Sequence, residues 1–141
     1  VRSRGLGDVY KRQYMHRCAA DAGWEARIVS GVPSFCAVAA RLGISLGEKD
    51  EEIHIIPAAY DMRESLGFHG TRIYMKSGKK LEELLRVLRE AMQDKESRVH
   101  QDIYGISNCG MENEQVYYGL DELEQAKGYL TTVIVKEHVV Q

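Results

Sequence analysis

Long apolar runs are missing from the 141-residue sequence, and no stretch reaches the roughly 20 apolar residues that a membrane-spanning helix needs. An excess of positive charge is missing too, because 19 Lys and Arg residues stand against 21 Asp and Glu residues and give a net charge of −2. Such a chain offers no general basic surface for nucleic acid. Since 44% of its residues are apolar, it can still bury a core. We expect a globular protein that binds neither membranes nor nucleic acid.

Paired cysteines and clustered metal ligands are missing as well. The three cysteines, Cys18, Cys36 and Cys109, lie far apart and form no Cys-x-x-Cys pair, which argues against a disulfide framework and against a zinc site. The five histidines are scattered without the spacing of metal ligands. We therefore predict no bound metal and a location in the reducing cytoplasm.

The common catalytic motifs are also absent. The sequence contains no G-x-G-x-x-G after a predicted strand, no P-loop, no G-x-S-x-G nucleophile elbow and no H-E-x-x-H metal motif. A nucleotide-binding fold, a serine hydrolase and a metalloprotease therefore each lack the residues by which they are usually recognised.

The first 13 residues, VRSRGLGDVYKRQ, differ in character from the rest. They carry four Arg and Lys residues without a sustained apolar period, and they lack the apolar centre of a signal peptide. They are similar to translated adaptor sequence at the broken ends of fragmentary reading frames. We expect residues 1–13 to be a non-native leader and the native part to begin near Tyr14.

Helical and strand patterns follow one another along the remaining sequence. The clearest helix follows Ser77, its predicted N-cap, because four leucines and Met92 lie on one side of it. In the predicted strand 71–76, Arg72, Tyr74 and Lys76 form a polar face. Further helices are predicted at 14–22 and 34–42, a helical turn at 121–125, and strands at 25–29, 53–56, 103–107, 115–118 and 130–135. This order predicts a mixed α/β fold with a mixed sheet, in which 115–118 and 130–135 pair antiparallel.

Three loops that follow predicted strands are candidates for a binding site. They are residues 30–35, 76–80 and 108–114, and the last reads NCGMENE. Ligands of open α/β sheets bind beyond the carboxyl ends of strands, so these loops are expected to share one cleft. In the third loop, a glycine would let the backbone approach a ligand and a methionine would offer a soft apolar contact.

The runs GVPSFCAVAARLGISL, IHIIPAAYD, IYMKSGKK, NCGMENEQVYYGLDEL and GYLTTVIVKE resemble the later part of the cobalamin-pathway tetrapyrrole methylases. The resemblance covers residues 14–137, and its most specific parts are MKSGKK and CGMENE. The latter is similar to the branch of the family whose acceptor is C20 of precorrin-2, either metal-free or in its cobalt form. The resemblance implies an S-adenosyl-L-methionine-dependent C-methyltransferase with two α/β domains, a cofactor cleft between them and a homodimeric full-length protein.

The same resemblance implies site residues. Cofactor contacts fall on Pro33, Ser34, Phe35, Met75, Gly110 and Met111. Because the implied substrate is a polycarboxylate, four cations are candidates for its recognition: Arg63, Lys76, Lys79 and Lys80. Two structural alternatives stay open: Met75 can fill a core at a strand end, and Lys79 and Lys80 can be solvated. No catalytic residue is assigned.

Two departures from the family pattern bear on activity. The first turn reads SGVPS where family members usually have PGVTS, so Pro33 lacks the expected hydroxyl. The family's Gly-Pro-Gly-Asp and Gly-Asp-Pro loops are absent. We therefore expect residues 14–46 to be the truncated end of a first domain, residues 47–141 to be a second domain, and the chain alone to be inactive. The alternatives are a related methylase with another acceptor, such as uroporphyrinogen or diphthamide, and a non-enzymatic α/β binding or assembly module.

Overall fold

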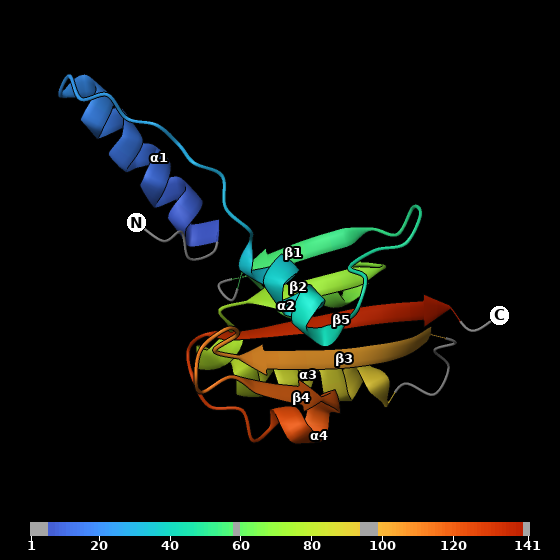
Figure 1. Cartoon of the computed structure of the whole chain (residues 1–141). Coiled ribbons are helices and arrows are strands. Elements are labelled where there is room, and N and C mark those ends of the chain that lie inside the picture. The colour runs from blue at the N-terminus through green and yellow to red at the C-terminus, as the bar shows by residue number, and fades with distance from the viewer. Residues whose placement is uncertain (1–5, 58–59, 94–98, 140–141) are drawn as a thin grey trace.

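The protein is built around one mixed β-sheet (Figure 1). The structure, a computed structural model, describes residues 6–57, 60–93 and 99–139. Its five strands lie in the order β1-β2-β5-β3-β4. They are β1 (Ile53–Pro57), β2 (Thr71–Met75), β3 (Val99–Ser107), β4 (Gln115–Tyr118) and β5 (Thr131–Val139). Only the β1–β2 pair is parallel, and the other three pairs are antiparallel, which confirms the predicted mixed sheet.

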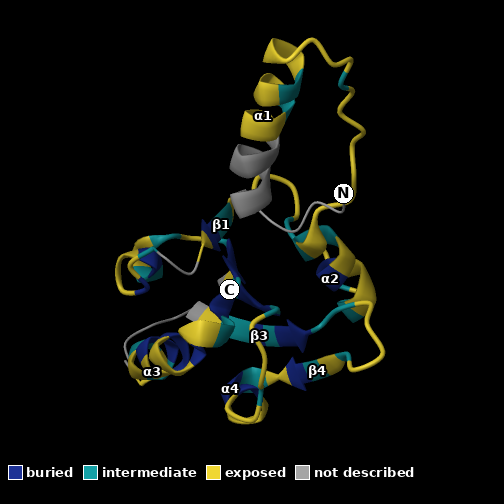
Figure 2. Cartoon of the chain, turned by 90° about the vertical axis from the view of Figure 1, so that its left-hand side faces the viewer, coloured by how far each residue is buried: buried dark blue, intermediate teal, exposed yellow. Residues whose placement is uncertain are grey.

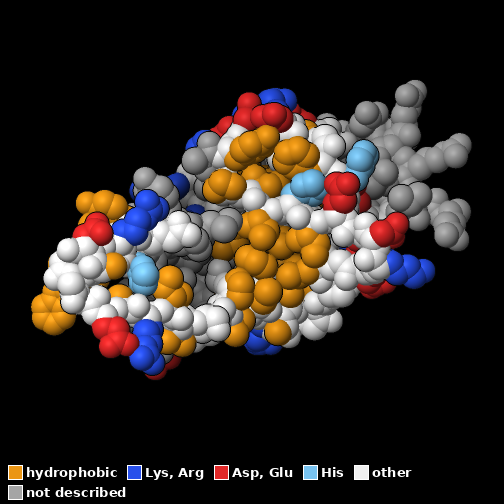
Figure 3. All heavy atoms as spheres, turned by 90° about the horizontal axis from the view of Figure 1, so that it is seen from above, with side chains coloured by type: hydrophobic (Ala, Val, Ile, Leu, Met, Phe, Trp, Pro, Cys, Tyr) orange, Lys and Arg blue, Asp and Glu red, His pale blue; other side chains and the backbone are white. Residues whose placement is uncertain are grey.

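Helices cover both faces of the sheet (Figures 1 and 2). Helix α3 (Leu81–Met92) and helix α4 (Gly119–Leu123) pack on one face, where they share a core with β2 and β5. The short helix α2 (Ser34–Leu42) packs on the other face through the buried Val38. Apolar side chains gather over the region of α2 and β1 when the molecule is seen from above (Figure 3). No helix in the described part of the chain is long and apolar enough to cross a membrane.

Helix α1 (Leu6–Asp21) lies away from the sheet in Figures 1 and 2. It runs across the boundary predicted between residues 13 and 14 and ends just before Gly23, which has a left-handed φ of 79°. The non-native leader and the two-domain division both stay predictions, and residues 1–5 lie outside the described residues. The strand predicted at 25–29 is wrong: this stretch is mostly exposed and is not part of the five-stranded sheet that the described residues form, because the strands of that sheet begin only at Ile53.

The start of α3 also corrects the sequence-based prediction. Ser77 is not its N-cap, because a short 3₁₀ turn (Ser77–Lys79) comes first and the helix begins at Leu81. The Ser77 hydroxyl instead donates a hydrogen bond to the Thr131 carbonyl oxygen at 2.9 Å. Of the predicted apolar side, the four leucines are buried and Met92 is half exposed. The Ser77 hydroxyl therefore links the turn before α3 to β5 and does not cap the helix.

The face of β2 that was predicted to be polar is buried. Strand β2 lies between β1 and β5, and all five of its residues are buried. Arg72 is fully buried and donates a hydrogen bond to Glu137 at 2.9 Å, while the Tyr74 hydroxyl lies 2.8 Å from the Ser65 hydroxyl. The alternating pattern thus assigns the residues of β2 to two faces correctly. It does not indicate that other elements cover both faces of this central strand.

Strands β4 and β5 do not pair, contrary to the sequence-based expectation. β3 and β5 share nine register positions, and β4 pairs with the opposite edge of β3 as a short hairpin of four positions. The longer ladder places β5 in the middle of the sheet, between β2 and β3. This placement brings the start of β5 beside the ends of β2 and β3.

Candidate functional site

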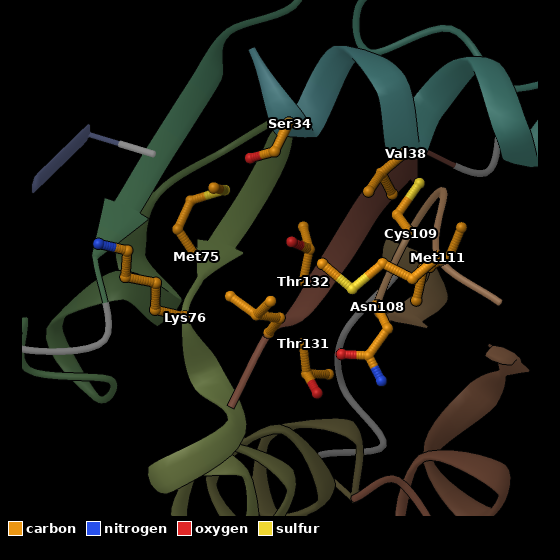
Figure 4. Close-up of a pocket in the computed structure, with 11 residues that line it drawn as sticks. Ser34, Val38, Met75, Lys76, Asn108, Cys109, Met111, Thr131 and Thr132 are labelled. Carbon is orange, nitrogen blue, oxygen red and sulfur yellow. The ribbon is translucent and has the colours of Figure 1, made fainter. Parts of the chain in front are cut away.

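A cavity of about 190 Å³ opens at the edge of the sheet where β2 and β3 end and β5 begins (Figure 4). Helix α2 and the loop 108–114 form its sides. All three loops that the sequence singles out contribute lining residues. The cavity is lined by Ser34, Val38, Met75, Lys76, Ile106, Asn108, Cys109, Met111, Leu130, Thr131 and Thr132.

Three of the six predicted cofactor contacts line this cavity: Ser34, Met75 and Met111. Met75 is only 5% exposed and belongs to the core beneath α2, so it serves both the core and the cavity wall. Met111 is 45% exposed, and Figure 4 shows its thioether reaching from the loop toward Thr132. The two methionines thus present apolar sulfur-containing side chains from different elements.

The other three predicted contacts lie beside the cavity rather than in its lining. Pro33 is the N-cap of α2, and its carbonyl oxygen accepts the N–H groups of Cys36 and Ala37. Phe35 packs on the core beneath α2. Gly110 has a left-handed φ of 76°, and its N–H donates a hydrogen bond to Glu114 Oε2 at 2.7 Å. A Cβ at Gly110 would meet no atom of the protein within 4 Å, so within the chain itself this position favours glycine for its left-handed turn, and its cofactor contact stays a prediction.

Of the four predicted cations, only Lys76 lines the cavity. Its backbone is left-handed with φ 56°, and Figure 4 shows its side chain extending along the cavity edge, away from Met111. Arg63 donates a hydrogen bond to Glu90 at 3.0 Å on the face covered by α3. The Lys79 ammonium lies 5.7 Å from the Tyr129 ring centroid, and the Lys80 ammonium lies 4.0 Å from Glu83. Substrate roles for these last three residues stay predictions.

Sequence reasoning missed the part of the cavity that β5 and the start of the loop supply. Leu130, Thr131 and Thr132 belong to a segment predicted to pair with a different strand, so its position at this edge was not anticipated. Asn108 and Cys109 belong to the NCGMENE motif, in which the predicted contacts were Gly110 and Met111. The available signal was Asn108 at a strand end, because asparagine tolerates the left-handed conformation it adopts there, with φ 54°.

Hydrogen bonds centred on Thr131 fix the floor of the cavity. The Thr131 hydroxyl donates to the Gly128 carbonyl oxygen at 2.9 Å and lies 2.9 Å from the Ser107 hydroxyl. The Thr131 carbonyl oxygen accepts the hydroxyl of Ser77. Ser77, Ser107 and Thr131 are each buried, so these bonds are shielded from water. They join the ends of β2 and β3 to the start of β5.

Charge and burial act together on Cys109. Burial raises the pKa of the Cys109 thiol, and the negative charge of the nearby Glu114 raises it further. The pKa of Glu114 is itself lowered, first by the Gly110 N–H and then by Arg41. At neutral pH the cavity wall therefore contains a protonated thiol next to an ionised carboxylate. In the described residues, no group of three or more His, Cys, Asp and Glu side chains is arranged to hold a metal.

Cys109 is expected to be alkylated by iodoacetamide at pH 8 several-fold more slowly than the exposed Cys18. The thiolate is the reactive form, and both burial and Glu114 disfavour it at Cys109. Time-resolved alkylation followed by peptide mass spectrometry measures both rates in one sample. In urea the two rates should converge, and a native Cys109 that reacts as fast as Cys18 would contradict this electrostatic description.

The chain matches one protein family and is similar to a named archaeal protein. The family described as Tetrapyrrole (Corrin/Porphyrin) Methylases matches residues 5–124. The chain is also 32% identical over 126 residues to a Methanocaldococcus jannaschii protein named as a probable cobalt-precorrin-2 C(20)-methyltransferase. This alignment covers 87% of the chain and 51% of the relative, so the chain spans about half the relative's length.

Solved structures show the same fold. A cobalt precorrin-4 methyltransferase matches with a TM-score of 0.68 and 13% identity, over 92% of this chain and 58% of that chain. The methyltransferase CobJ matches with a TM-score of 0.59 and 18% identity, over 96% and 60%. A Thermus thermophilus uroporphyrin-III C-methyltransferase in complex with S-adenosyl homocysteine matches with a TM-score of 0.58 and 13% identity, over 84% and 55%. At these identities the likeness concerns the fold alone.

Proposed function

The chain belongs to the tetrapyrrole methylase family, and from this premise we propose that it forms part of a methyltransferase of the cobalamin pathway. The proposed reaction transfers the methyl group of S-adenosyl-L-methionine to C20 of precorrin-2 or of cobalt-precorrin-2. The observation that carries the choice of substrate is the 32% identity with the M. jannaschii relative, whose name states this reaction for the cobalt form.

The lining of the cavity fits one portion of the cofactor. Val38, Met75 and Met111 offer apolar surface, and Asn108 and Thr132 add a few polar groups, as is usual in sites for small ligands. The cavity of about 190 Å³ is smaller than the roughly 300–1,000 Å³ of typical ligand pockets. These residues would therefore hold part of S-adenosyl-L-methionine, and the chain supplies one part of its binding site.

The proposed methyl transfer requires the side chains of this chain mainly to align the reacting groups. When bound, S-adenosyl-L-methionine supplies a methyl group on a positively charged sulfur, which a substrate carbon can take directly. This chain's residues need not provide a nucleophile, and their work is to orient the ligands in the cavity. The apolar side chains of Val38, Met75 and Met111 also limit the access of water to this place.

Lys76 is the one residue with a formal charge among the described residues that line the cavity. Its positive charge repels a cationic sulfur and attracts a carboxylate. The side chain extends along the cavity edge rather than into the centre (Figure 4). We assign it to the substrate side of the site, where it would pair with a carboxylate of the tetrapyrrole.

Calorimetric titration with S-adenosylhomocysteine tests the proposed cofactor site. We expect the chain to bind this ligand weakly and Met111→Ala to reduce the affinity by about fivefold, because truncation removes apolar contact worth about 1 kcal/mol. Met92→Ala is the matched control, since Met92 has a similar exposure, 50% against 45%, and lies in α3. Absence of binding at millimolar ligand would overturn the cofactor site, and equal affinities of the two variants would remove Met111 from it.

Two further properties remain part of the proposal. The three cysteines are unpaired, which fits a reducing compartment and supports the cytoplasm as the proposed location. The resemblance to the family supports a homodimer for the full-length protein. Sedimentation of the full-length protein tests this oligomeric state.

A further inference from the structure

One carboxylate joins the two sides of the cavity. Glu114 Oε1 accepts a hydrogen bond from Arg41 Nε at 2.6 Å, and its Oε2 accepts the Gly110 N–H at 2.7 Å. Arg41 belongs to α2, whereas Gly110 and Glu114 belong to the loop 108–114. The Glu114 side chain is only 15% exposed, although its partner Arg41 is 58% exposed. A single carboxylate therefore links the loop to the helix by hydrogen bonds, beside the apolar packing of Cys109 on the core beneath α2.

The residues that Glu114 holds lie next to residues that line the cavity. Arg41 is three positions after Val38, hence on the same side of α2, and Gly110 lies between Cys109 and Met111. Among the described residues, Arg41–Glu114 is the one side-chain hydrogen bond between α2 and the loop. Loss of this bond is therefore expected to shift lining residues both in α2 and in the loop.

The rest of the loop is held mainly by its own backbone. The Asn108 N–H donates to the Leu130 carbonyl oxygen at 3.0 Å, which fixes the start of the loop to the sheet. Beyond that point, the Met111 N–H donates to the Asn108 carbonyl oxygen at 2.9 Å, and the Glu114 N–H donates to the Met111 carbonyl oxygen at 3.1 Å. These turns define a local shape but do not fix its distance from α2.

The charge on Glu114 suits this function. Its pKa is lowered by the Gly110 N–H and by Arg41, so the carboxylate is ionised at neutral pH. Hydrogen bonds in which one partner is charged are shorter and about twice as strong as neutral ones. The Gly110 N–H is bound to Glu114, and the loop lines the cavity through Asn108, Cys109 and Met111.

We propose that Glu114 is a positioning residue that ties the loop 108–114 to α2 through Arg41 and Gly110 and thereby sets the affinity of the cavity for the adenosyl cofactor. This inference rests on the proposed function for the identity of the ligand. In this proposal, the last glutamate of the NCGMENE motif maintains the shape of the cavity and does not contact the cofactor or the substrate.

Glu114→Gln and Glu112→Gln form a matched pair for the test. Both substitutions remove one negative charge from the same loop, but Glu112 is exposed and has no hydrogen bond to α2. Titration with S-adenosylhomocysteine and amide hydrogen exchange at Gly110 and Met111 are measured on the full 141-residue chain. For Glu114→Gln we expect affinity to fall and Gly110 exchange to rise by about tenfold each, the size expected for losing a hydrogen bond to a charged group. Glu112→Gln should match the wild type.

Arg41 variants separate positioning from a general loss of structure. Arg41→Lys keeps the charge and should retain most of the affinity, whereas Arg41→Ala should approach Glu114→Gln. Thermal unfolding should change little in the two Arg41 variants, because Arg41 is largely exposed. A loss of affinity that only follows a lower Tm would overturn the positioning role, as would wild-type affinity and exchange in Glu114→Gln.

The two proposals fail in different ways. If the wild-type chain binds no S-adenosylhomocysteine, the proposed cofactor site fails, and hydrogen exchange at Gly110 and Met111 decides on the tie alone. Faster exchange in Glu114→Gln than in Glu112→Gln then supports the tie between loop and helix but removes its role in cofactor affinity. Equal exchange in the two variants overturns the tie itself.

Discussion

Gly78→Ala is expected to lower the free energy of unfolding by about 3 kcal/mol or more, at the upper end of what overpacking costs. A Cβ at residue 78 would lie 2.8 Å from both the Gly128 carbonyl carbon and the Tyr129 Cα, and closer still to the Gly128 carbonyl oxygen. All three atoms are backbone, so no side-chain rotation can relieve the contact. The chain before β5 would have to move away from the turn that precedes α3.

Urea or thermal unfolding measures this effect, and a Tm lower by roughly 10 °C is expected. Gly67→Ala and Gly31→Ala are the controls, because a Cβ at either position meets no atom within 4 Å and neither backbone has a positive φ. Both should change stability by less than about 0.5 kcal/mol. A Gly78→Ala protein as stable as these controls would mean that the segment before β5 does not pack on the turn.

Glu137→Ala is expected to cost about 3–5 kcal/mol, because it leaves the charge of Arg72 buried without its partner. Arg72 is fully buried, and the Glu137 side chain is 11% exposed. Arg72 Nη2 donates to Glu137 Oε1 at 2.9 Å, and Gln101 Nε2 donates to the same oxygen at 3.2 Å. Arg72 Nε and Nη1 have no hydrogen-bond partner among the described residues, so nothing there replaces the lost carboxylate.

Equilibrium unfolding in urea tests this result together with a double variant. Arg72→Met combined with Glu137→Leu should recover much of the loss, since apolar groups often replace a buried ion pair at little cost. Glu25→Gln is the control, because the Arg27–Glu25 pair has side chains 85% and 78% exposed and should contribute less than about 1 kcal/mol. Equal effects of Glu137→Ala and Glu25→Gln would contradict the burial of this pair.

Local signals in the sequence predicted several elements well. Helix α2 spans the predicted residues 34–42 and ends at Gly43, which has the left-handed φ typical of a helix C-terminus. Strand β1 begins at the predicted residue and includes Pro57 at its end, and β4 matches its predicted bounds. These bounds were predictable because glycine, proline and β-branched residues affect the backbone only within a few residues of their own positions.

Long-range contacts account for what the sequence did not reveal. Ser77 looks like an N-cap, but its hydroxyl bonds to Thr131, 54 positions away. Arg72 looks like a solvated strand residue until β5 brings Glu137 beside it. In the candidate site, the motifs identified Ser34, Met75, Lys76 and Met111, whereas the contribution of β5 depended on a strand order that local patterns do not encode.

The cavity is held on its β5 side by the hydrogen bonds centred on Thr131 and on its α2 side by Arg41 and Glu114, and these two sides open by different routes. The β5 side is joined by buried bonds from Ser77 and Ser107 and can separate only when the central strands separate. The α2 side is closed by a pair in which Arg41 is more than half exposed, so its opening is a local event of much lower free energy. Entry and departure of the proposed cofactor are therefore expected on the α2 side, and its residence time should follow the rate at which the loop leaves the helix.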